Sequence, residues 1–102
     1  MEEIEKKEYV WLVENDDDTF TVKTKQGDYI MEELTDDEIE KITKLSQKVN
    51  KTVQALLAAK CIKSPEVSDS DFGKLKSSTT SRLKFTAMKI NGLMDFLWIK
   101  MV

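Results

Sequence analysis

VQALLAAKCIKSP, residues Val53 to Pro65, is the stretch that decides the fold: an apolar helix, a stop, and the only proline in the chain. With about 100° between successive residues, its side chains divide into two opposite arcs. One arc holds Val49, Val53, Leu56, Leu57 and Cys61, and the other holds Ala55, Ala58, Ala59 and Ile62. We expect this helix to pack on two sides, at the centre of a small domain, and to end where Pro65 restricts Ser64 to extended conformations.

Lys60 is the exception to this pattern, because the wheel places it inside the first apolar arc, between Leu56 and Leu57. We expect its aliphatic stem to pack on the domain while the ammonium reaches water and meets a carboxylate. A catalytic lysine is the less favoured alternative.

The length of 102 residues predicts a single domain, residues 1–102, since a chain of this size cannot build a second core. No apolar run reaches the ~18 residues that span a membrane. The first eight residues, MEEIEKKE, lack the basic and apolar regions of a secretory signal, which favours a cytoplasmic location and argues against a membrane partner.

Composition also argues against enzymatic chemistry. Histidine, the commonest general base and metal ligand, is absent. The one cysteine lies on the apolar arc, where a buried thiol is expected. Glu38, Lys60 and Cys61 are the only candidate catalytic residues, and none has a partner at a reactive spacing. We therefore expect a protein that is not an enzyme and that uses no cofactor and no metal.

Charge is divided unevenly along the chain. Residues 1–50 carry 15 acidic and 7 basic side chains, whereas residues 51–102 carry 4 and 9. Two solvated faces are the simplest interpretation. The alternative is electrostatic docking of one half on the other, within a chain or head to tail between copies.

Strand-like alternation runs from Glu8 to Thr24, interrupted by the polar loop 14–18. A turn at 25–28 then leads to a short strand, Tyr29 to Glu33, which completes a three-stranded antiparallel meander. The acidic loop resembles a calcium ligand set only in composition, since it lacks the glycine and distant glutamate of an EF-hand loop, so a turn is favoured.

Helical signals follow from residue 34. Thr35-Asp36-Asp37-Glu38 is a capping box, and the helix that it starts carries Ile42, Leu45 and Val49 on one stripe. Asn50 is the expected break, although a continuous helix from 36 to 62 stays open. A short helix starting at Ser68 and a last helix from Ser81 complete the series, the latter ending at Asn91-Gly92 or continuing to residue 101. The predicted fold class is α+β, with a meander over residues 1–33 and a bundle of about four helices over 34–102.

The last ten residues, LMDFLWIKMV, hold only two charges and form either core or an exposed contact surface. As a contact surface they supply the candidate protein-binding residues: Met94, Phe96, Leu97, Trp98, Ile99 and Met101.

Three motifs in order form a familiar pattern: ELTDDEIEKITKL (33–45), LLAAKCIKSPEVSDSDFGKL (56–75) and KINGL (89–93). Together they resemble the small tail assembly chaperones of long-tailed phages and prophages. Members of that family show a helix ending in an apolar-x-x-Pro step, an acidic helix start, and a last helix that closes near an Asn-Gly pair. Here 62–65, 68–71 and 90–93 stand in those places, and the resemblance covers about 60 of the 102 residues.

The resemblance implies a non-enzymatic protein that acts in the host cytoplasm during virion assembly. It would bind the tape measure protein and recruit tail tube subunits without remaining in the finished tail. Homo-oligomers are also possible for such a module. The chain departs from the family in being short and in having a more pronounced N-terminal hairpin.

The alternative function is a small nucleic-acid-binding regulator that uses residues 51–62, 69–76 and 79–91 as a helix-turn-helix trio. Lys84 and Lys89 would reach phosphates. Arg82 is the only arginine, however, and no helix presents a cluster of Arg, Asn and Gln for base edges, so nucleic acid is a less favoured partner.

Overall fold

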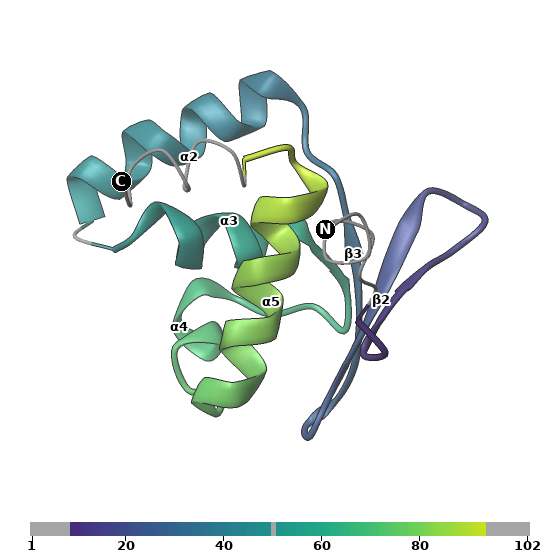
Figure 1. The fold of residues 1–102 in the computed structure, drawn as a ribbon. Helices are drawn as coiled ribbons and strands as arrows, with labels where there is room; N and C mark the ends of the chain where they lie inside the picture. Colours follow the sequence, from purple (N-terminus) through teal and green to yellow (C-terminus); the bar gives the residue numbers. More distant parts are fainter. Residues whose placement is uncertain (1–8, 50, 94–102) are drawn as a thin grey trace, which may run out of the picture.

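A four-stranded antiparallel sheet stands on one side of the protein and the helices on the other (Figure 1). The structure is a computed structural model that describes residues 9–49 and 51–93. The elements in chain order are β1 Leu12–Glu14, β2 Thr19–Thr24, β3 Gly27–Glu32, α2 Asp36–Val49, α3 Val53–Cys61, β4 Ile62–Ser64, α4 Asp69–Phe72 and α5 Ser77–Ile90. The predicted α+β class and the N-terminal meander are confirmed.

The strands of the sheet lie in the order β1-β2-β3-β4. In the β2–β3 pair Phe20 lies opposite Met31 and Val22 opposite Tyr29, so these four share one face. Val22 and Met31 are completely buried. The turn between the two strands is closed by Thr24, whose hydroxyl donates to the Gly27 carbonyl at 2.7 Å. Gly27 has a φ of +109°, which only glycine adopts readily.

The predicted three-stranded sheet is wrong by one strand, because the segment after α3 joins the sheet as β4. Ile62 pairs with Met31 and Ser64 with Ile30. Pro65 supplies the reason: it disfavours helical backbone at Ser64, and the extended segment that results finds a partner in the free edge of β3. The Ser64–Pro65 peptide bond is cis.

α3 is the central helix, and its expected packing on two sides is confirmed. It contacts α2, α4 and α5, and the side chains of Leu57 and Ala58 are completely buried. The predicted phase of the wheel is wrong, however, since Lys60 is exposed and Ile62 is buried. Ile62 lies in β4 instead of the helix, so its side chain follows the sheet register and not the helical period.

The helices do not form the predicted bundle. α4 is only four residues long, and α5 packs on both α3 and β2. α2 and α3 are separate helices that form an antiparallel hairpin along one edge of the protein (Figure 1), so a continuous helix over 36–62 is excluded. Thr52 caps α3 by accepting from the Ala55 N–H at 3.1 Å.

The helix boundaries agree with the sequence signals at two sites and differ at a third. Ser68 caps α4, as expected, by accepting from the Asp71 N–H at 3.2 Å. α5 ends at Ile90 before Gly92, whose φ is +71°, and therefore does not continue to residue 101. It begins at Ser77, earlier than predicted, because the Thr80 hydroxyl bonds the carbonyl one turn back instead of capping the helix start.

One apolar core joins the sheet to the helices. Its fully buried members come from β2, β3, α3 and α5: Val22, Met31, Leu57, Ala58, Leu83 and Ala87. A cluster of aromatic rings extends it toward the N-terminal segment, with centroids of Tyr9 and Trp11 5.1 and 5.8 Å from that of Phe85. These ring contacts fix the segment that leads into the β1–β2 hairpin on α5.

Candidate functional site

An apolar groove between α2 and α3 is the first candidate site. It has a volume of about 300 Å³. Its lining residues are Glu38, Lys41, Ile42, Leu45 and Lys60. Ile42 and Leu45 supply the apolar floor, and the three charged residues form its rim. An apolar floor with a charged rim is typical of surfaces that receive an amphipathic helix.

The apolar stripe of α2 is covered only over its first part. Ile42 is buried, whereas Leu45 and Val49 are 40% and 42% exposed. These two residues lie four positions apart, so they are neighbours on one face of the helix. The sequence identifies the stripe, but it does not show that α3 leaves the second half of it uncovered.

The rim of the groove carries both signs of charge. The Thr35 N–H and hydroxyl donate to the Glu38 carboxylate at 3.0 and 3.1 Å, and the Glu38 N–H donates to the Thr35 hydroxyl at 3.3 Å, which confirms the capping box. The backbone hydrogen bond from Thr35, followed by the one from its hydroxyl, lowers the pKa of Glu38 below its ordinary value of 4.5. Glu38 is therefore ionised at neutral pH, and the charges of Lys60 and Lys41 act in the same direction.

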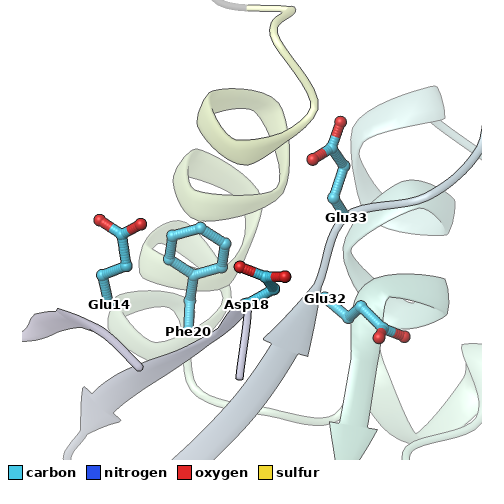
Figure 2. Close-up of a pocket in the computed structure, with 5 residues that line it drawn as sticks. All are labelled: Glu14, Asp18, Phe20, Glu32 and Glu33. Atoms are coloured by element: carbon cyan, nitrogen blue, oxygen red, sulfur yellow. The ribbon is translucent and has the colours of Figure 1, made fainter. Parts of the chain in front are cut away.

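A second candidate site lies at the end of the sheet, where four acidic residues and one aromatic residue line a pocket. This pocket has a volume of about 370 Å³. It is lined by Glu14, Asp18, Phe20, Glu32 and Glu33. Figure 2 shows Glu14, Phe20 and Glu33 rising from the same side of the sheet, while Glu32 points away from them. The alternation of side chains along β3 and beyond accounts for this difference.

The loop before β2 builds one wall of this pocket and is held by hydrogen bonds of its own side chains. The Asp17 carboxylate accepts from the Thr19 hydroxyl at 2.6 Å and from the Thr19 N–H at 3.2 Å. The first of these bonds is the main cause of a lowered pKa at Asp17. Asn15 donates to the hydroxyls of Thr19 and Thr21 at 3.1 and 3.0 Å, and Asp18 takes a φ of +67°. The loop is a turn held by its own side chains, as predicted.

Cys61 lies in the interior at the end of α3, where it is only 1% exposed. Burial raises the pKa of its thiol from 9.0 to about 11, although the Asn91 side chain donates a hydrogen bond to its sulfur at 3.3 Å. The thiolate that nucleophilic chemistry requires is therefore disfavoured at neutral pH.

The three candidate catalytic residues do not converge on one reacting centre. Glu38 and Lys60 stand on the rim of the groove, and Cys61 is buried beside Asn91. Within residues 9–49 and 51–93, no three Cys, Asp or Glu side chains are arranged to hold a metal ion. The candidate protein-binding residues Met94, Phe96, Leu97, Trp98, Ile99 and Met101 lie outside the described residues.

The helix-turn-helix alternative depends on basic side chains of α5. Arg82, the only arginine of the chain, donates to the Lys23 carbonyl at 2.6 Å, and its guanidinium carbon lies 5.2 Å from the centroid of the Trp11 ring. It is thus engaged within the protein. The middle helix of the trio, α4, is short and carries Asp69 and Asp71, which would repel phosphates.

Comparison with known proteins identifies no relative, since no family model, curated protein or solved structure matches this chain. None of the helices in the described part of the chain has the length and apolar character needed to cross a membrane.

Proposed function

We propose that this protein is a non-enzymatic binding module whose α2–α3 groove receives an amphipathic helix of a partner protein. The observation that carries the proposal is the exposed half of the α2 stripe, in which Leu45 lines the groove and Val49 lies one helical turn further along α2. Large apolar side chains next to one another on a surface mark sites of protein contact. The rim charges Glu38, Lys41 and Lys60 would set the orientation of the bound helix.

The partner that we propose is the tape measure protein of a long-tailed phage or prophage. The resemblance of residues 34–93 to tail assembly chaperones supports this assignment. The protein would act in the cytoplasm of the host, recruit tail tube subunits to the tape measure, and contribute residues 94–101 as a further contact. An oligomer along the tape measure is compatible with the same surface.

A binding assay with helical segments of the tape measure protein from the same genome tests the proposal. We expect Leu45→Glu to weaken binding on the order of tenfold or more, because burial of a leucine side chain is worth about 1.5–3 kcal/mol. Val13→Glu is the matched control, since Val13 is exposed to nearly the same extent, 39% against 40%, but lies on β1.

The control variant should bind as the unchanged protein does. Equal loss of affinity in Leu45→Glu and Val13→Glu would contradict the use of the groove. A folded protein that binds no tape measure segment would contradict the assignment of the partner.

A further inference from the structure

The described chain ends close to one end of the α2–α3 groove, the end at which Glu38 and Lys60 lie. Asn91, which ends α5, accepts a hydrogen bond from the Leu34 N–H at 2.8 Å and donates one to the Cys61 sulfur at 3.3 Å. Leu34 lies two residues before α2, and Cys61 is the last residue of α3. The end of α5 is therefore fixed between the two helices that form the groove.

The chain leaves this position toward residue 94. The Leu93 N–H donates to the Met88 carbonyl at 2.8 Å, and the Leu93 side chain packs against the core. Glu38 and Leu45, at the two ends of the groove, are separated by about 10 Å along α2. Nine residues reach ~30 Å when extended and ~13 Å when helical, so a segment of this length is long enough to span the groove in either conformation.

The composition of residues 94–102 matches the groove. The segment reads MDFLWIKMV, in which Asp95 and Lys100 are the only charged residues. Its apolar side chains match the apolar floor formed by Ile42 and Leu45, and the negative charge of Asp95 is complementary to the basic residues of the rim.

We propose that residues 94–102 occupy the α2–α3 groove of their own chain. A segment attached next to its site has an effective concentration in the millimolar range, which favours this arrangement over a second copy at lower protein concentrations. This inference rests on the proposed function in that the groove is the same. It adds that binding of the partner is regulated, because the partner helix and residues 94–102 compete for one site.

The fluorescence of Trp98 can detect this contact in the absence of a partner protein. Its emission is obtained as the difference between the spectra of the unchanged protein and Trp98→Phe, since Trp11 is the only other tryptophan. We expect a blue-shifted Trp98 emission, as for an indole in apolar surroundings. Leu45→Glu should shift this emission to the red, and Val13→Glu should leave it unchanged. Val49→Glu, one helical turn beyond Leu45 on the exposed stripe of α2, is a second variant that should also shift the emission to the red if Leu45→Glu fails to fold, as judged by circular dichroism.

Two results would overturn the inference: Trp98 emission typical of an exposed indole in the unchanged protein, or a blue shift that both Leu45→Glu and Val49→Glu retain. Dilution distinguishes docking within one chain from docking on a second copy, because docking within one chain does not depend on protein concentration. A blue shift that is lost on dilution would therefore also overturn it. Since no tape measure segment is present, these results are independent of the binding assay that tests the proposed function.

Discussion

Asn91 connects three parts of the chain through one side chain. Its oxygen accepts from the Leu34 N–H ahead of α2, and its amide nitrogen donates to the Cys61 sulfur and to the Ala87 carbonyl. The sequence predicts Asn91 only as a helix stop. The contact with Leu34 joins residues 57 positions apart, and no local pattern indicates it.

We expect Asn91→Ala to lower the free energy of unfolding by about 1–3 kcal/mol, because the Leu34 N–H would lose its acceptor in a partly buried position. Urea denaturation followed by circular dichroism measures this loss. Lys89→Ala is the matched control: Lys89 is exposed in the last turn of the same helix, and its truncation should change stability by less than about 0.5 kcal/mol. Equal effects of the two substitutions would show that the Asn91 hydrogen bonds contribute little.

Because the thiol of Cys61 is buried, we expect the protein to lose stability at high pH. Its thiol ionises near pH 9.0 in the unfolded chain and near 11 in the folded protein, because burial disfavours the thiolate. Between these values the unfolded chain releases its proton first, so the free energy of unfolding should fall by about 1.4 kcal/mol per pH unit. Below pH 9 the thiol should make no pH-dependent contribution.

Urea denaturation from pH 8 to pH 10.5 checks this slope, with Cys61→Ala as the reference in which all other groups titrate alike. The difference in slope between the two proteins isolates the thiol. Rapid alkylation of Cys61 in the folded protein at pH 8 would contradict its burial, whereas alkylation is expected once urea unfolds the chain.

At the scale of the elements, Val53 to Pro65 determines more of the fold than a helix and its end. The sequence correctly predicts the apolar helix, its two packing sides and the stop before Pro65. It does not predict β4, since strand pairing depends on an edge supplied by β3, some thirty residues earlier in the chain. The error at Ile62 has the same origin, because a helical wheel does not apply to a residue that has left the helix.

The alanines of α3 make its close packing testable. Ala58 is completely buried, so Ala58→Leu should lower the free energy of unfolding by about 1–3 kcal/mol through overpacking. Ala55→Leu is the control, since Ala55 lies on the same helix but is only partly buried, and a smaller effect is expected there. Chemical denaturation of both variants provides the comparison. A neutral Ala58→Leu would show that the core has room beside α3.

At the scale of the whole molecule, the sequence predicts only part of each candidate site. The stripe of Ile42, Leu45 and Val49 is evident from its spacing, but which of its residues α3 covers depends on how the two helices pack. The acidic pocket needs the register of β1, β2 and β3, because Glu14 and Phe20 are cross-strand neighbours while Glu33 follows the adjacent strand. Spacing along one element does not reveal sites that several elements build.

The unequal charge of the two halves leads to a prediction about salt. Within the described residues, the halves meet through the apolar core, and one ion pair joins them, Glu32 to Lys63 at 3.5 Å, with side chains 48% and 52% exposed. Such exposed pairs contribute at most about 1 kcal/mol.

We therefore expect less than about 1 kcal/mol of change in the free energy of unfolding on raising NaCl to about 1 M, where charges are screened beyond ~3 Å. Lys63→Ala should have an equally small effect at low salt. Denaturation in urea, which is uncharged, measures both, and a large loss of stability in salt would instead indicate that charge attraction holds the acidic half on the basic half.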